Sequence, residues 1–318
     1  MTRLADPKPE TTEQFSPLLF IGVNSATLVG LLSVVRLGFP AVWAEQIHAG
    51  WGPGAVAFVA ISLVNSFIEY FLHRYVLHTP ALPWVRRLYR QHTLHHGLTH
   101  IGLKRMPDGR GILFVENRFP IVEEHQGEAA FFPWYSLAVF AAIISPGLAL
   151  LQWLLPHYPW FLAGYLSLTT SLVLYEGLHA LNHLPFEKWA PLIAHARWGG
   201  LWRRAYGFHL RHHAVTDCNE SISGFFGLPI TDWIFGTCIL PRTLYASGEE
   251  WKPEDFRSPR PRKVIRWLDA RAAAAVERRR QRAAQLIRSA TAKPARPEVA
   301  LHPSQPAHLP PTGPHRSR

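Results

Sequence analysis

The sequence predicts an all-α membrane protein in which four transmembrane helices support a helical cap on the cytoplasmic side. Three observations lead to this fold class. Apolar residues make up 48% of the 318 residues and charged residues only 17%, and the apolar residues are concentrated in four long segments. Lysine and arginine are frequent in some connections and missing from others. Ten of the 18 histidines form four short clusters, and two of these clusters end apolar segments.

The four apolar segments meet the length of about 20 mostly apolar residues that a helix needs to cross a bilayer. They cover residues 17–38, 53–73, 133–155 and 160–179. One such segment could be a buried helix of a large soluble protein. Four of them in one chain favour an integral, multi-pass membrane protein.

The connections between the segments predict the orientation in the membrane. Residues 38–52 and the turn "PHYP" at 156–159 contain no lysine or arginine, whereas residues 79–132 contain seven. Positively charged loops remain preferentially in the cytoplasm. We therefore expect both termini and the histidine clusters on the cytoplasmic side. Arg36 is the exception, at the far end of the first segment, and its long side chain can reach the interface there.

Composition divides the chain into three parts. Residues 1–16 form a polar N-terminal segment that lacks the features of a signal peptide. Residues 17–250 hold the transmembrane segments and the histidine clusters, and residues 1–250 together carry 17 Lys+Arg against 17 Asp+Glu. Residues 251–318 hold 16 against 5, so the net charge of +11 comes from this part. It is expected to form a basic helix from Arg260 and a Pro-rich, disordered end, either attracted to anionic lipid head groups or simply solvated. No nucleic-acid-binding module accompanies the charge.

The histidine clusters have spacings typical of metal ligands, and we call them boxes 1 to 4. They are, in chain order, His73 and His78; His92, His95 and His96; His179 and His183; and His209, His212 and His213. Spacings of three and four place imidazoles on one face of a helix, so each H-x-x-H-H box is expected to supply one metal-binding face. The spacing of five in box 1 fits less well. Either the helix breaks there or the pair serves two different metals.

Ten imidazoles are too many for one ion, and two ions with about five ligands each is the natural count. Imidazole suits iron, zinc, copper and nickel. A hydrolytic site would more commonly recruit carboxylates, and no Asp or Glu lies inside the boxes. The prediction is therefore a dinuclear site with two iron ions that performs oxygen chemistry on a molecule dissolved in the bilayer. Zinc is a possible substitute in purified protein, because it competes well for imidazole sites.

Residues 69–241 resemble the fatty acid hydroxylase/sterol desaturase superfamily, which consists of integral-membrane, histidine-rich diiron oxygenases. "EYFLHRYVLH" is similar to the first box of that family, and "HTLHH" and "HLRHH" match its two H-x-x-H-H boxes. "GLPITDWIFGT", at 227–237, is similar to the segment that usually follows the last box. The resemblance implies that all ten histidines bind the metals. It is loose for the substrate, because family members act on acyl chains, sterols, carotenoids, aldehydes and ether lipids.

Four polar residues near the boxes are candidates to orient the ligands. Metal-bound histidines usually donate their second N–H to a carboxylate or a carbonyl. The candidates are Glu69, Glu176, Asp217 and Asn219, which lie within four residues of a box or directly follow the last one. Ordinary solvation at the membrane interface is the alternative for each. His100 and His125 in the loop after box 2 are candidates for auxiliary ligands or substrate contacts.

Together these observations predict an O₂-dependent diiron hydroxylase that inserts one oxygen atom into a C–H bond of a membrane lipid or fatty acyl chain. Lipid or sterol desaturation and carotenoid hydroxylation are alternatives that use the same site. A membrane metal transporter is a non-enzymatic alternative, but transporters place ionisable ligands at mid-membrane, whereas the boxes cluster at one side. The sequence contains no electron-carrier domain, so an external donor of the ferredoxin or cytochrome type is implied.

Overall fold

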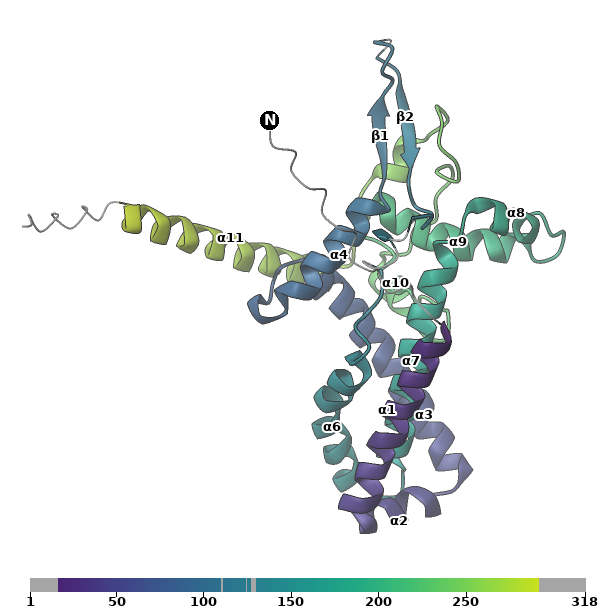
Figure 1. The fold of residues 1–318 in the computed structure, drawn as a ribbon, viewed down its shortest axis with the longest axis vertical. Helices are drawn as coiled ribbons and strands as arrows, with labels where there is room; N and C mark the ends of the chain where they lie inside the picture. The colour runs from purple at the N-terminus through teal and green to yellow at the C-terminus, as the bar shows by residue number, and fades with distance from the viewer. Residues whose placement is uncertain (1–16, 110, 124, 127–129, 292–318) are drawn as a thin grey trace, which may run out of the picture. The chain divides into compact units, whose positions relative to one another are not determined.

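The computed structural model describes residues 17–109, 111–123, 125–126 and 130–291. Four of its helices are long and apolar enough to cross a membrane: α1 (Pro17–Gly38), α3 (Trp51–Leu72), α6 (Ser136–Leu154) and α7 (Trp160–Asn182). They coincide with the four predicted apolar segments, so the predicted spans are confirmed by length and composition (Figure 1). The N-terminal segment 1–16 and the Pro-rich end 292–318 lie outside the described residues.

The chain divides into two compact units, Met1–Ala275 and Val276–Arg318. The described part of the second unit is the end of the basic helix α11 (Lys263–Thr291). Residues 251–275, which composition alone groups with the tail, belong to the first unit. There Ile265 is fully buried in a small cluster with Tyr70 and Phe235.

The four long helices show apolar side chains on their outer surface and polar ones inside. Leu18 is 83% exposed, Val34 62% and Leu150 54%, whereas Asn24 and Ser167 are buried. A contiguous apolar exterior of this kind is unusual for a soluble monomer and suits contact with lipid tails. Helix α7 is the centre of the bundle, because α1, α3 and α6 all pack against it.

One end of the bundle is closed by a short helix, α2 (Pro40–His48), which forms within a connection that the sequence predicts only as a loop. Gln46 of α2 donates a hydrogen bond to Gln152 of α6. The same two amides accept from the first backbone N–H groups of α7, at Trp160, Phe161 and Leu162. These N–H groups have no partner within the helix, so the two glutamines cap α7. The α1–α3 and α6–α7 connections therefore lie at the same end.

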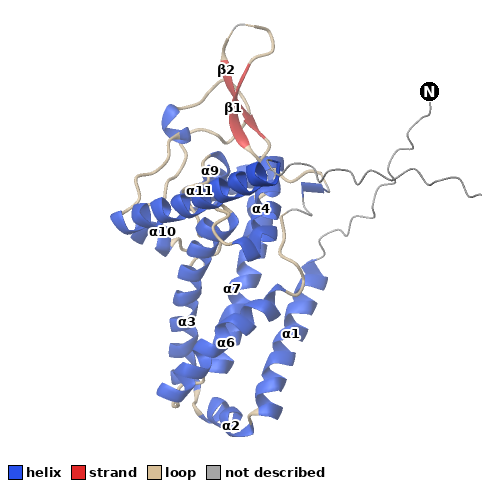
Figure 2. Ribbon diagram, turned by 90° about the vertical axis from the view of Figure 1, so that its left-hand side faces the viewer, coloured by secondary structure: helices blue, strands red, loops and turns tan. Residues whose placement is uncertain are grey.

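The cap lies at the other end (Figure 2). Its helices are α4 (Arg86–Leu98), α8 (Phe186–Ile193), α9 (Gly199–Ala214) and α10 (Ile230–Phe235), with short helical turns η1 (His73–Leu77), η2 (Pro83–Val85) and η3 (Pro253–Phe256). Tyr206 and Leu210 of α9 pack in its core with Phe119, which lies in the loop before α6. A helical cap is thus confirmed, while the side of the membrane on which it lies remains a prediction.

The cap also contains a two-stranded antiparallel sheet, which the all-α prediction missed. Strands β1 (Ile101–Arg105) and β2 (Leu113–Asn117) pair with Ile101 opposite Asn117. Gly109, with φ +74°, follows Asp108 in the connection. An Asp-Gly pair between short apolar runs is a hairpin signal that was available in the sequence.

Candidate metal centre

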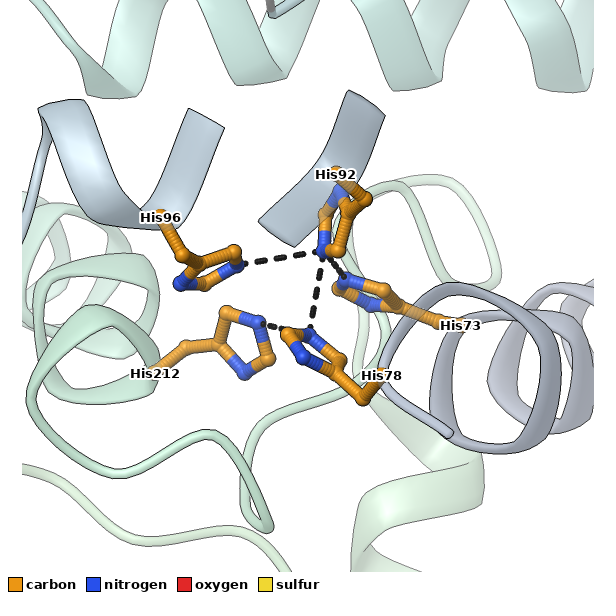
Figure 3. Close-up of side chains that lie close together, drawn as sticks. All are labelled: His73, His78, His92, His96 and His212. Atoms are coloured by element: carbon orange, nitrogen blue, oxygen red, sulfur yellow. Dashed lines mark hydrogen bonds between the residues drawn. The ribbon is translucent and has the colours of Figure 1, made fainter. Parts of the chain in front are cut away.

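All ten histidines of the four boxes meet in the cap, where they form two clusters of five. Group A consists of His73, His78, His92, His96 and His212, and group B of His95, His179, His183, His209 and His213. Within each group one ring nitrogen per histidine lies within 4.8 Å of all the others. Figure 3 shows group A, with imidazoles from separate segments of the chain directed at a common centre. Each group could hold a metal ion.

Box 1 reaches group A through a change of helix type. At the end of α3 the chain forms the π-helical turn η1, in which the N–H of His78 donates to the carbonyl of His73 at 3.0 Å. In an α-helix, residues five apart point roughly 140° away from each other. A π turn has i→i+5 hydrogen bonds, so it places the two side chains above one another. Their ring centroids are 4.9 Å apart. The pair therefore neither breaks the helix nor serves two groups, which corrects both sequence-based alternatives.

Each H-x-x-H-H box is divided between the two groups, contrary to the expectation that one box supplies one face. On α4, His92 and His96 belong to group A and His95 belongs to group B. On α9 the arrangement is reversed, because His209 and His213 belong to group B and His212 to group A. The physical reason is that α4 and α9 each lie between the two groups. Residues four apart then face one group, and the residue between them faces the other.

The two groups are adjacent. The rings of His96 in group A and His213 in group B are stacked with centroids 4.1 Å apart. Group B is buried throughout, whereas His78 and His96 of group A are half-buried.

The contacts inside the groups are unsuited to a network of hydrogen bonds. The Nε2 atom of His92 lies 3.0 Å from Nε2 of His73, 3.0 Å from that of His78 and 3.1 Å from that of His96. A neutral imidazole has one N–H and one lone pair, so it can donate to one of these neighbours at most. Three such contacts on one atom are explained if the lone pairs share a cation.

Backbone carbonyls fix the ring orientation of several histidines. The Nδ1–H of His183 donates to the Phe119 carbonyl at 2.6 Å, and that of His212 donates to the Cys218 carbonyl at 2.7 Å. His73 and His213 donate in the same way, to the carbonyls of Glu220 and Thr99. With the proton on Nδ1, Nε2 carries the free lone pair and faces the centre of the group.

The nitrogen spacing fits a metal ion. Nε2 atoms in contact are 3.0–3.1 Å apart in group A and 3.1–3.2 Å apart in group B. With metal–nitrogen bonds of about 2.1 Å, ligands at right angles are about 3.0 Å apart and tetrahedral ligands about 3.4 Å apart. The spacing thus favours an ion with more than four ligands, and the ten residues fit two such ions.

Burial keeps these imidazoles in the form that binds metal. It lowers the pKa of His183 to about 4. The pKa values of His78, His92, His95, His96, His209, His212 and His213 are likewise well below the usual range for histidine, chiefly because of burial. All eight side chains are therefore neutral near pH 7, and a neutral ring can coordinate a metal without first losing a proton.

The four polar candidates for ligand orientation have other partners. Glu69 accepts from the N–H groups of Ser223 and Gly224, and Glu176 accepts from the N–H of Phe132 at 2.8 Å. The Asn219 side chain joins its loop to α9, at the carbonyl of Phe208, and to the backbone of Ile239. Asp217 contributes its backbone carbonyl, which accepts from Arg74 at 2.9 Å. These side chains hold the loops around the site in place, whereas the contacts to the histidines come from carbonyls.

Sequence reasoning missed the pair of Arg74 and Glu220. The Glu220 side chain is fully buried, its Oε1 accepts from Arg74 at 2.8 Å, and its Oε2 lies 3.7 Å from Nδ1 of His73. Both signals were in the sequence: an arginine inside box 1 and a glutamate shortly after box 4. His100 and His125 lie outside both groups, next to Glu116 and Glu123.

A cavity of about 170 Å³ reaches group A from the helix bundle. His73 and Tyr175 line it, together with apolar residues of α3, α6 and α7.

Comparison of the chain with family models, with curated proteins and with solved structures gave no match. The geometry of the two groups and the cavity is therefore the basis for the function.

Proposed function

We propose that this protein is an O₂-dependent membrane oxygenase that holds two iron ions, one in group A and one in group B, and inserts one oxygen atom into a C–H bond of a membrane lipid or fatty acyl chain. One observation carries the proposal: ten imidazoles, most of them buried, form two adjacent five-nitrogen groups at the end of an apolar, membrane-type bundle, with an apolar cavity leading to one of them.

The all-nitrogen ligand set favours a redox metal. Within the described residues, neither group contains a carboxylate or a cysteine. Structural zinc sites use four ligands, often with cysteine, and two-metal hydrolases commonly use carboxylates. Five imidazoles in each group suit iron, and two iron ions bound there would supply the activation of O₂.

The overall reaction consumes one C–H bond, one O₂, two electrons and two protons, and gives one C–OH group and one water. The substrate supplies two electrons and the other two must come from outside. An external donor of the ferredoxin or cytochrome type fits this requirement. The cytoplasmic side is the proposed location of the site, because lysine and arginine are concentrated in the connections at the end of the bundle that holds the histidines.

The residues of this chain have three tasks in the reaction. The carbonyls of Phe119, Cys218 and Thr99 orient imidazoles so that their Nε2 lone pairs converge. Burial of group B keeps water from the metal site. The cavity brings an apolar substrate to His73 of group A. Placing one carbon beside the oxidant is what sets the position of reaction.

The test uses iron-loaded protein in lipid vesicles with a ferredoxin-type donor, a reductant and ¹⁸O₂, followed by mass spectrometry of the lipids. We expect a lipid heavier by one ¹⁸O atom. His95→Ala should lose metal and nearly all product, because an incomplete ligand set binds metal weakly. His100→Ala, in the neighbouring loop, is the matched control and should retain both.

Several outcomes would contradict the proposal. Label arriving from H₂¹⁸O instead of O₂ would indicate hydrolysis. A lipid lighter by two hydrogen atoms would show that the site catalyses desaturation rather than hydroxylation. Movement of metal across the vesicle membrane, without lipid oxidation, would indicate a transporter.

A further inference from the structure

The cavity that reaches group A lies between helices α3, α6 and α7 at the depth of the membrane-spanning segments. Ile68 and Leu72 of α3, Phe140 and Ile144 of α6 and Leu172 of α7 provide most of its apolar lining. The polar side chains of Asn65, Glu69 and Ser223 at its wall have hydrogen-bond partners within the protein. The Glu69 carboxylate, for example, accepts hydrogen bonds from Ser223 and Gly224. The cavity therefore suits an apolar ligand.

The cavity is open toward the lipid between α3 and α6. Two residues at its wall, Ile68 of α3 and Ile143 of α6, are 45% and 63% exposed. Both helices pack against α7, and the cavity occupies the space between them. A molecule dissolved in the bilayer can thus enter sideways, without passing through water.

The long direction of the cavity follows the helix axes. His73, Leu77 and Tyr175 line the end at the histidines, whereas Asn65 of α3 and Leu168 of α7 line the opposite end. Asn65 and His73 are eight residues apart, which is roughly 12 Å along a helix.

The deep end of the cavity is polar. Asn65 donates to the hydroxyl groups of Ser167 at 3.0 Å and Ser171 at 3.3 Å, and Ser62 shares a hydrogen bond with Ser167 at 2.8 Å. Apolar groups gain nothing from contact with this cluster, so the apolar part of the cavity ends there.

We propose that the cavity binds one unbranched acyl chain of a bilayer lipid, with the carbons near the polar head group beside His73 and the rest of the chain extending toward Asn65 and out between Ile68 and Ile143. Resting on the proposed function, this assigns the oxidation to a carbon close to the head group. An apolar lining that runs between α3, α6 and α7 from His73 toward Asn65 suits a single unbranched chain.

The direction of the chain follows from the position of the histidines. Group A lies where the long helices end, at the level of the lipid head groups rather than at mid-membrane. The polar head of a lipid stays at that level, because its transfer into hydrocarbon is costly. The part of the chain that can reach His73 is therefore the part nearest the head.

Photo-crosslinking tests this placement without any catalysis. Metal-loaded protein in vesicles is irradiated, without O₂ or reductant, with one of two phospholipids that carry a diazirine either near the head or about eight carbons further along the chain. Peptide mapping should place the first label near Leu77, Phe132 or Tyr175 and the second near Ile144 or Leu168. Excess unlabelled acyl lipid should compete with both probes, and a sterol should compete with neither.

Two cavity-filling variants and a matched control complete the test. Ile144→Trp and Ser171→Leu should each lower the labelling of the cavity by about fivefold or more, because the chain must compete with the added side chain. Leu150→Trp, on the outer face of the same helix α6, should leave it unchanged. A reversed order of labels, competition by the sterol, or full labelling in both filled variants would overturn this inference. Oxygenated lipid without cavity labelling would also overturn this inference, while leaving the proposed function intact. Cavity labelling without oxygenation would support the placement of the chain and contradict the proposed function.

Discussion

Arg74 connects three segments of the chain through its guanidinium group. Its Nη1 donates to Glu220 and to the Asp217 carbonyl, while Nε and Nη2 donate to the two oxygens of Asp269 in α11. Glu220 is fully buried, and its own carbonyl accepts from His73. The ion pair thus holds the loop after box 4 against the turn that carries box 1.

Removing the arginine should destabilise the cap strongly. Arg74→Ala leaves the Glu220 carboxyl buried without its counter-charge, and loss of one partner of a buried pair costs about 3–5 kcal/mol. The free energy of unfolding, measured by denaturant titration in a mild detergent, should fall by that amount. The double variant Arg74→Met/Glu220→Gln should lose less than the single variant, because no fully buried carboxylate is left without a partner. Arg90→Ala, exposed on α4, should change it by less than about 0.5 kcal/mol. Equal losses in the single and double variants would show that the charge pair is not the cause.

At this scale the sequence identified the ten histidines but not their partners. Metal-ligand spacing is a local pattern, so boxes 1 to 4 can be recognised in isolation. The acceptors of the Nδ1 protons are backbone carbonyls such as those of Phe119 and Cys218, and every residue has a carbonyl. Which of them faces an imidazole depends on how distant loops fold, and no residue type marks it.

The helices of the cap distribute their histidines by face. Helices α4 and α9 each give an i, i+4 pair to one group and a single histidine to the other, while η1 and α7 each give a pair to one group. Each group therefore receives two pairs and one single residue from three segments. This exchange ties the two groups together, since neither α4 nor α9 can move without affecting both.

Double variants on α4 should reveal this division in the metal content. His92→Ala/His96→Ala removes two ligands of group A, so the chain should retain about one ion, held by group B. His95→Ala/His96→Ala removes one ligand from each group and should bring the metal content close to zero. Both double variants remove two histidines, so only the distribution of the lost ligands differs. Total iron and zinc per chain, measured by elemental analysis after purification, checks this. If each box served a single metal, the two double variants would have the same metal content.

Element boundaries were predictable where length and apolarity decide them. Helix α1 has the predicted bounds and α6 differs by a few residues, because about 20 apolar residues leave little freedom in a bilayer. The π turn η1 was not predictable in the same way. Its five residues alone would prefer an α-helix, and the longer i→i+5 turn is favoured only because it brings His78 to the side of His73, where His92 and His212 lie. Tertiary packing decides it.

At the scale of the whole molecule, the two helical hairpins of the bundle point the same way. The contact between Gln46 and Gln152 joins the α1–α3 and α6–α7 connections at one end, and the histidine groups lie at the other. The arrangement agrees with four spans that begin and end on one side. Hydropathy predicts that number of spans from the sequence alone, but the absolute orientation depends on the lysine and arginine asymmetry, which acts during insertion rather than in the folded protein.

We predict that the histidine groups face the cytoplasm. His157 lies exposed in the α6–α7 turn, and Arg87 lies exposed on α4 beside box 2. In a Cys238→Ser background, with Cys218 buried, His157→Cys should react with a membrane-impermeant maleimide added outside intact cells. Arg87→Cys should react only after the cells are permeabilised, because seven lysine and arginine residues in its loop oppose translocation. The two variants control for each other, because both introduced cysteines are exposed and they lie at opposite ends of the bundle. Labelling of Arg87→Cys in intact cells, with protection of His157→Cys, would invert the topology and remove the cytoplasmic electron donor from the proposed reaction.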